Sequence, residues 1–224
     1  MRSQANLDQY GIAIIANVMT HMPTLETPRL IIRPFSMDDL HPIHRILDVE
    51  LRQAELGTAG VQTLHERAQW LQWTILSYAQ LAQLYQPPYG ERAVVHKHTG
   101  QLIGACGFVP CLDTFEQFPA FSPVPQPSRQ WFSTPEFGLF YAIAPALQGQ
   151  GYATEAAQAM VDYAFQHLRV KRVVATTTYD NTASMGVMRK LGMRIAGNPY
   201  PEPPWLQIVG VLENNAIAEE RGRN

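Results

Sequence analysis

Hydrophobic residues recur at helical spacing in two long stretches of the chain and in two shorter ones. A Thr-x-x-Glu capping box at Thr63 opens an apolar pattern over 64–82, and a second long pattern runs over about 153–168. Ser36 is placed to cap a helix that follows it, and a short helix over 181–191 ends at Gly192. The chain is therefore expected to hold two long helices and two short ones.

Short apolar and β-branched runs between these helices predict strands. They cover 29–35, 92–97, 101–109, 136–143, 172–178 and 206–212. Residues 110–135 are rich in Pro, Phe and Ser and show no period, so a long loop is expected there. The order of elements predicts an α/β fold on a mixed sheet.

The length of 224 residues favours one domain, placed at 22–224 and preceded by an N-terminal extension over 1–21. The apolar run 11–19 within that extension is far too short to span a bilayer. A signal peptide begins with a basic segment. Asp8 interrupts that segment here, and no clear cleavage site follows. The run could instead pack on the body of the protein or in a dimer, so a monomer and a homodimer both stay open.

The charge balance and the cysteine count limit the class of protein. A net charge of −2 gives no basic face for nucleic acid, and no membrane partner is expected. Two cysteines, Cys106 and Cys111, do not make a disulfide framework, which favours a reducing cytoplasm. His96 and His98 lack a third ligand at metal spacing, so no metal site is predicted.

The most informative segment lies between the strand at 136–143 and the helix after it. Small residues there let the chain turn tightly, and the helix adds unpaired N–H groups and the positive end of its dipole. Such a turn is a cradle for a diphosphate. The residues expected to bind it are Gln148, Gly149, Gln150, Gly151, Tyr152, Ala153 and Thr154.

Two other phosphate-binding motifs do not fit this segment. The third glycine of a dinucleotide fingerprint is replaced by Thr154, and the Gly-Lys-Ser/Thr of a P-loop is absent. The guest favoured by the sequence is the diphosphate of coenzyme A, because the spacing of Gln148, Gly151 and Ala153 fits Gln/Arg-x-x-Gly-x-Gly/Ala.

Four ordered motifs resemble the GNAT superfamily of N-acetyltransferases, within it most closely the branch of the ribosomal-protein-alanine acetyltransferases. They are LETPRL at 25–30, EFGL at 136–139, QGQGYATEA at 148–156, and Asn181-x-x-Ser184 with KLGM at 190–193. The resemblance implies a mixed, mostly antiparallel sheet flanked by helices, with splayed strands that form the acyl-CoA cleft. It implies transfer of an acetyl group from acetyl-CoA to a primary amine by direct attack in a ternary complex.

The resemblance also implies roles for individual residues. Glu136 is the candidate general base, and the alternative is a strand-end carboxylate that pairs with an arginine. Ser184 is expected near the thioester sulfur, or else is an ordinary first-turn serine, and Asn181 is a cofactor contact, a helix cap, or both. The backbone of Tyr141, Ala142 and Ile143 is expected to bind the pantetheine arm as an added strand would.

Departures from the family pattern leave the acceptor and the proton donor open. Leu139 stands where that branch has Tyr, and the last strand lacks one. They motivate an alternative, a catalytically silent domain that binds acyl-CoA for regulation or scaffolding. Cys106 lies mid-strand and is expected to be a small hydrophobe rather than an acyl carrier. We expect five aromatic residues of the long segment to close over the acceptor, or else to pin the loop as a small core: Phe115, Phe118, Phe121, Trp131 and Phe132.

Overall fold

In the computed structural model, residues 23–52, 60–118, 121 and 132–214 are described. Their strands form one eight-stranded sheet in the order β1-β2-β3-β4-β5-β6-β8-β7. The strands are β1 (Leu25–Glu26), β2 (Leu30–Arg33), β3 (Glu91–His96), β4 (Leu102–Asp113), β5 (Thr134–Ile143), β6 (Arg172–Thr177), β7 (Arg194–Gly197) and β8 (Ile208–Glu213). Neighbouring strands are antiparallel except β5 and β6, so the predicted mixed, mostly antiparallel sheet is confirmed.

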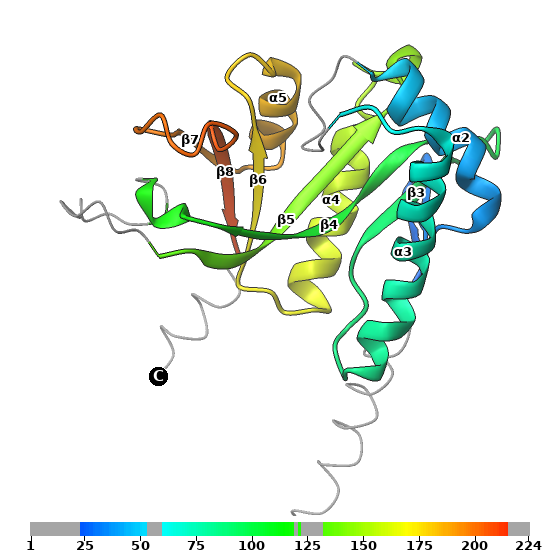
Figure 1. Ribbon diagram of the computed structural model, residues 1–224, viewed down its shortest axis with the longest axis horizontal. Helices are drawn as coiled ribbons and strands as arrows, with labels where there is room; N and C mark the ends of the chain where they lie inside the picture. Colours follow the sequence, from blue (N-terminus) through cyan, green and yellow to red (C-terminus); the bar gives the residue numbers. More distant parts are fainter. Residues whose placement is uncertain (1–22, 53–59, 119–120, 122–131, 215–224) are drawn as a thin grey trace, which may run out of the picture.

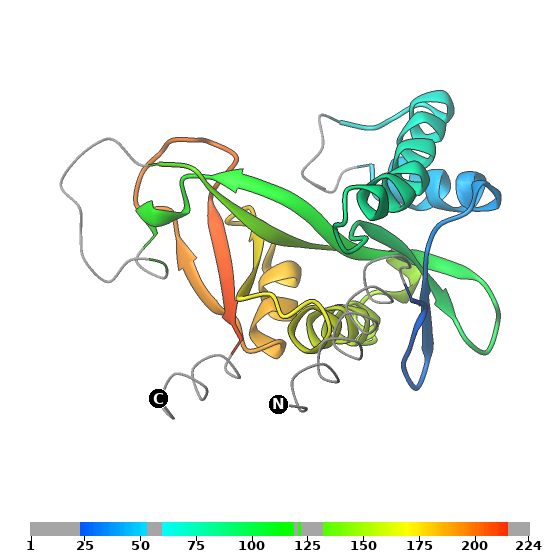
Figure 2. The same cartoon turned by 90° about the horizontal axis from the view of Figure 1, so that it is seen from below.

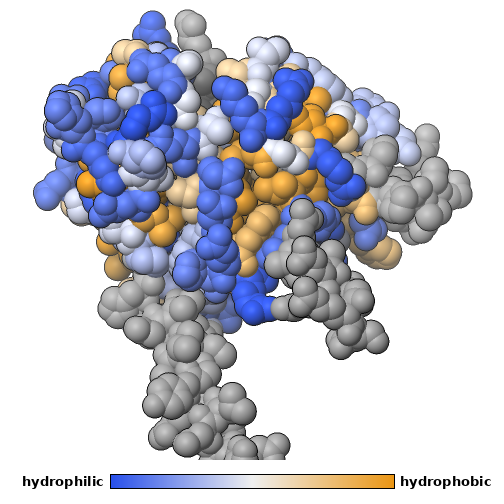
Figure 3. Space-filling model, turned by 180° about the vertical axis from the view of Figure 1, so that it is seen from behind, coloured by the Kyte–Doolittle hydropathy of each residue, from blue (hydrophilic) through white to orange (hydrophobic). Residues whose placement is uncertain are grey.

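Helices cover both faces of this sheet (Figure 2). The helices α2 (Leu40–His44) and α3 (Leu64–Gln83) lie on one face, and α4 (Tyr152–Gln166) and α5 (Thr182–Lys190) lie on the other. Alternate residues of a strand point to opposite faces, and β5 shows this clearly. Leu139 and Ile143 belong to the core under α4, whereas Ala142 belongs to the core under α2 and α3. On the α4 side the surface keeps a hydrophobic area bordered by hydrophilic side chains (Figure 3).

The two parallel strands at the centre pair over only a short stretch. Phe137 is opposite Val173 and Gly138 is opposite Val174, although β5 continues to Ile143 and β6 continues to Thr177. The strands diverge toward their carboxyl ends, as Figure 1 shows. This is the predicted splay, and it leaves one edge of β5 without a partner strand.

The loop predicted over 110–135 is wrong at both ends. The β4–β5 ladder continues past Pro110 and Pro135 to the pair Asp113 and Thr134. Residues 115–117 then form a 3₁₀ turn, whereas 119–120 and 122–131 lie outside the described residues. The short strands β1 and β7 are not predicted either, because two and four residues carry too little pattern to be found.

Three of the five aromatic residues of this segment pack into a small core instead of closing over an acceptor site. Phe115 and Phe118 are fully buried against Val174, Leu206 and Val209, and the ring of Phe121 stacks on Phe115. They form the small core that the sequence offers as the alternative. Phe132 is exposed, and Trp131 lies outside the described residues.

Two further predictions are less clear-cut. The helix expected after Ser36 is broken into a 3₁₀ turn at Met37–Asp39, the short α2 and a π-helical turn at Arg45–Glu50. The extension 1–21 and Met22 lie outside the described residues, so the domain boundary stays a prediction.

Candidate active site

The turn before α4 adopts a backbone conformation that glycine favours. Gly149 has a φ of +73° and Gly151 a φ of +85°, both in the left-handed region. Gly151 is the N-cap of α4. A side chain at Gly149 would meet no atom within 4 Å, so the restriction there is set by the backbone and not by crowding.

This turn presents six consecutive N–H groups without an internal acceptor. The N–H of Gln148 donates to Pro145 and that of Glu155 donates to Gly151, but among the described residues no group accepts from the N–H groups of residues 149–154. Unpaired amides at a helix N-terminus, aided by the helix dipole, attract anions. The geometry therefore fits the diphosphate cradle that the sequence predicts.

An N-terminal segment of the chain braces the cradle. The hydroxyl of Thr27 donates to the carboxylate of Glu155 at 2.6 Å, and the backbone N–H of Arg29 donates to the same oxygen at 2.9 Å. The guanidinium of Arg29 binds the other oxygen at 2.6 Å and donates to the carbonyl of Gln150 at 3.0 Å. It also lies over the ring of Tyr152, 4.3 Å from the centroid.

Both partners of this brace lie in motifs found in the sequence, LETPRL and QGQGYATEA, but the contact between them is not predicted. Burial raises the pKa of the Glu155 carboxyl, but the hydrogen bonds from Thr27 and Arg29 outweigh it, so the net shift is downward. Glu155 is therefore held as an anion in the first turn of α4. The two motifs are about 125 positions apart, and their joint presence is the signal that could have revealed the pair.

The open edge of β5 offers backbone groups beside the cradle. The N–H of Ala144 donates to Ile103 at 2.9 Å, and antiparallel pairing alternates, so the backbone groups of Ala142 also point toward β4. Tyr141 and Ile143 point to the opposite edge, which β6 leaves unpaired. The side chain of Gln148 donates to the carbonyl of Ile143 at 2.9 Å and ties the cradle to that edge. Of the three predicted backbone contacts, the geometry offers Tyr141 and Ile143 and turns Ala142 away.

Two hydroxyl groups meet where β5 faces the first turn of α5. The hydroxyls of Tyr141 and Ser184 lie 2.8 Å apart, and the Tyr141 hydroxyl also donates to the Ser184 carbonyl at 3.1 Å. Burial raises the pKa of Tyr141 to about 12, so its hydroxyl stays protonated at neutral pH. The N–H of Ser184 donates to the side chain of Asn181 at 3.0 Å, which is the cap expected as one role of that residue. The contact of the Tyr141 hydroxyl with Ser184 is not predicted from the sequence.

Glu136 lies elsewhere on the same strand. Its carboxylate is buried and forms a two-oxygen ion pair with Arg172, one arm of which measures 2.8 Å. Hydrogen bonding to Glu136 raises the pKa of Arg172. Glu136 precedes Tyr141 by five positions, roughly 17 Å of extended strand. The structure brings Glu136 to an arginine and not to Ser184, and its role as a base stays a prediction.

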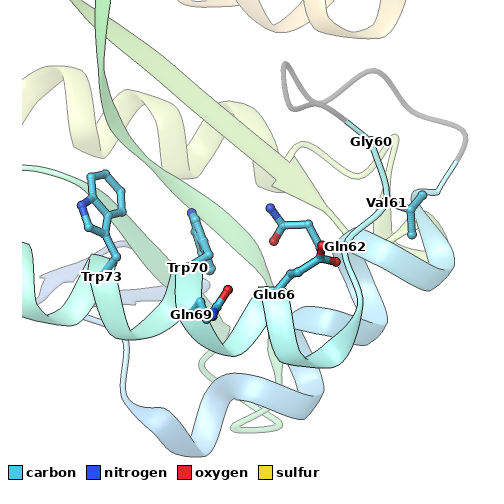
Figure 4. Close-up of a pocket in the computed structure, with 7 residues that line it drawn as sticks. All are labelled: Gly60, Val61, Gln62, Glu66, Gln69, Trp70 and Trp73. Atoms are coloured by element: carbon cyan, nitrogen blue, oxygen red, sulfur yellow. The ribbon is translucent and has the colours of Figure 1, made fainter.

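A pocket of about 470 Å³ lies along the first half of α3, on the other face of the sheet (Figure 4). The side chains of Trp70 and Trp73 project from the same side of the helix, and Trp73 is 58% exposed. Trp70 packs against the core that contains Ala142 and Ala144, the neighbours of Tyr141 and Ile143. The pocket, which no sequence motif predicts, is lined by Gly60, Val61, Gln62, Glu66, Gln69, Trp70 and Trp73.

Other candidate chemistry is limited within the part of the chain that the structure describes. Cys106 is fully buried and burial raises the pKa of its thiol to about 12, which makes it a poor nucleophile. No cluster of three or more His, Cys, Asp or Glu side chains is found among the described residues. In the same residues, no helix combines the length and the apolar character that a membrane crossing requires.

A splayed α/β sheet with a cradle of free amides beside its open strand edge defines an acyltransferase type of domain. The family model for the acetyltransferase (GNAT) domain matches residues 29–194, which is most of the chain. The chain therefore belongs to the GNAT acetyltransferase family, as the sequence motifs predict.

Known proteins show the same relationship. An uncharacterized N-acetyltransferase of Bacillus subtilis, YnaD, is 37% identical over 68 residues, which cover 30% of this chain and 40% of the relative. The alignments with the first curated relatives span 40–64% of their lengths. A GNAT-family acetyltransferase from Bacillus anthracis shares the fold with a TM-score of 0.63 at 20% identity, over 86% of this chain and 99% of the other. A ribosomal-protein-S5-alanine acetyltransferase from Vibrio fischeri shares it with a TM-score of 0.59 at 16% identity, over 87% and 98%.

Proposed function

We propose that the protein transfers an acetyl group from acetyl-CoA to a primary amine in a ternary complex. The observation that carries this proposal is the run of free amides at residues 149–154, next to the open edge of β5. The cradle would take the diphosphate, and the backbone of Tyr141 and Ile143 would pair with the pantetheine arm. A cytoplasmic location and the absence of a nucleic-acid or membrane partner stay predictions from the sequence.

In the proposed reaction a neutral amine attacks the thioester carbonyl, so a C–N bond forms and the C–S bond breaks. An α-amine, with a pKa of about 7.7–8.0, is already neutral in about a tenth of molecules at pH 7, whereas a lysine-like amine needs a stronger base. The leaving thiolate takes a proton from the hydroxyl of Ser184, which is hydrogen-bonded to that of Tyr141, and water then returns a proton to Ser184. The proton lost by the amine passes to water, because Glu136, the base that the sequence predicts, is paired with Arg172.

The pocket beside Trp70 and Trp73 is our candidate for the acceptor entrance. It lies on the α3 face, and Trp70 packs against the core to which Ala142 of β5 also belongs. Its aromatic walls and the carboxylate of Glu66 suit a cationic or aromatic amine. Protein N-termini and small-molecule amines both satisfy this description.

The test combines binding and turnover on the full-length protein. Titration calorimetry should show acetyl-CoA binding in the micromolar range, and a thiol dye should report CoA release that depends on an added amine from a mixed library. Binding without amine-dependent thiol release would support the alternative, a silent acyl-CoA-binding domain. Absence of binding would overturn both.

A further inference from the structure

The cradle carries no cationic side chain of its own. Its polar side chains are all uncharged, although a diphosphate brings negative charge; they belong to Gln148, Gln150, Tyr152 and Thr154. The first turn of α4 even carries an anion, because Glu155 is held ionised there. A carboxylate at this place opposes a second anion at the same helix N-terminus, so something must offset it.

Arg29 is the group placed to offset it. Its Nη2 lies 2.6 Å from the Glu155 carboxylate. Its guanidinium also donates a hydrogen bond to the carbonyl oxygen of Gln150, a residue inside the run of free amides. An added Cβ at Gly151 would come within 3.4 Å of the same guanidinium, so the cation lies directly beside the N-cap of α4. The ring of Tyr152, stacked against the guanidinium, fixes its position.

We propose that Arg29 is a positioning residue for the diphosphate, supplied by the N-terminal strand region in place of a basic residue in the cradle. It neutralises Glu155 and holds the Gln150 carbonyl in a hydrogen bond, so that the cradle presents amides and net positive potential to the ligand. This inference rests on the proposed function, because it concerns the same cofactor site.

Loss of Arg29 should therefore impair only the use of acetyl donors that carry the diphosphate. Without Arg29, the charge of Glu155 is uncompensated and repels the diphosphate, but it does not act on a donor that ends at pantetheine. Arg29→Ala should raise the KM for acetyl-CoA about tenfold with kcat nearly unchanged. The kcat/KM for S-acetylpantetheine should stay within about twofold of the parent protein.

The experiment measures both donors with one amine acceptor, for the parent protein and four variants. In the Arg29→Ala background, Glu155→Gln should recover most of the lost affinity for acetyl-CoA, because it removes the uncompensated charge. Thr27→Val removes a brace on Glu155 without a change of charge and should alter the KM less than Arg29→Ala does. Lys97→Ala removes a cation from a neighbouring ion pair with Glu26 and should leave both donors unaffected.

The outcomes separate this inference from the proposed function. Equal losses on acetyl-CoA and S-acetylpantetheine, or no recovery with Glu155→Gln, would show that Arg29 only braces the fold and would overturn the inference. If the parent protein used neither donor, the proposed function itself would fail. Should Arg29→Ala unfold, as thermal melting would reveal, Glu155→Gln alone decides: it should lower the KM for acetyl-CoA, and a raised KM contradicts the inference.

Discussion

The cradle and the pocket lie on opposite faces of the sheet and are built in different ways. On the α4 side, the cradle is built from main-chain amides and is braced by residues about 125 positions away, Thr27 and Arg29. On the α3 side, the pocket is built from side chains, most of them on one helix, and Trp73 is 58% exposed. The cradle is suited to a ligand that stays the same, whereas the lining of the pocket can change with few substitutions.

This difference teaches where specificity can vary in the protein. Main-chain amides present the same N–H donors whatever their side chains are. A site built from them therefore depends on the conformation of the backbone and little on the identity of the side chains. A pocket lined by Trp, Gln and Glu side chains depends on the identity of each one. We therefore expect substitutions on the α4 side to affect the acetyl donor and those on the α3 side to affect the amine.

The largest effect is expected at Gly151. A valine there would have to adopt a φ of +85°, which is strained for a β-branched residue, and its side chain would crowd Arg29. Gly151→Val should weaken CoA binding about 100-fold or more, as measured by calorimetry. Gly100→Val is a matched control, because Gly100 has a φ of +68° in a hairpin turn away from the cradle. Equal binding by both variants would refute a backbone-built site.

The next largest effect concerns the hydroxyl pair. Ser184→Ala should lower kcat about tenfold with little change in the KM for acetyl-CoA, because a thiolate with a pKa near ~8.5 needs only modest help to leave. Tyr141→Phe removes the partner of Ser184 and should lower kcat less. Because burial raises the pKa of Tyr141 to about 12, the pH–rate profile of Tyr141→Phe should keep the parental shape below about pH 10. If the fall in kcat of the double variant equals the product of the falls in the two single variants, the hydroxyls act independently.

A smaller effect is expected on the α3 side. Trp73→Ala should raise the KM for the amine several-fold and leave the KM for acetyl-CoA unchanged, since the indole lines the pocket and not the cradle. Leu76→Ala is the control, because Leu76 is exposed on the same helix and does not line the pocket. Steady-state kinetics with each substrate varied in turn separate the two constants. A change in the KM for acetyl-CoA alone would contradict the expectation that the α3 side affects the amine and the α4 side affects the donor.

The sequence predicts the α4 side far better than the α3 side, and the reason is physical. The cradle is one contiguous turn, and its backbone conformation requires glycines. Residues 148–154 are therefore almost sufficient to predict it. The bond between Tyr141 and Ser184 and the brace of Arg29 on Glu155 join distant segments, and periodicity cannot show such contacts. The burial of Phe115 and Phe118 and the pocket at Trp70 depend on how the elements pack, which local patterns do not encode.

The smallest effect on activity is expected at Glu136, the predicted base. Its side chain is 7% exposed and paired with Arg172, so Glu136→Gln should cost about 2 kcal/mol of unfolding free energy, because it removes the ionised partner of the two-oxygen pair. The turnover rate should change less than about threefold, because roughly 17 Å of strand separates Glu136 from Tyr141. Chemical denaturation and the pH–rate profile measure the two quantities. If turnover instead fell by about two orders of magnitude and the acidic limb of the profile disappeared, Glu136 would be established as the base, and the proton acceptor would lie at the far end of β5.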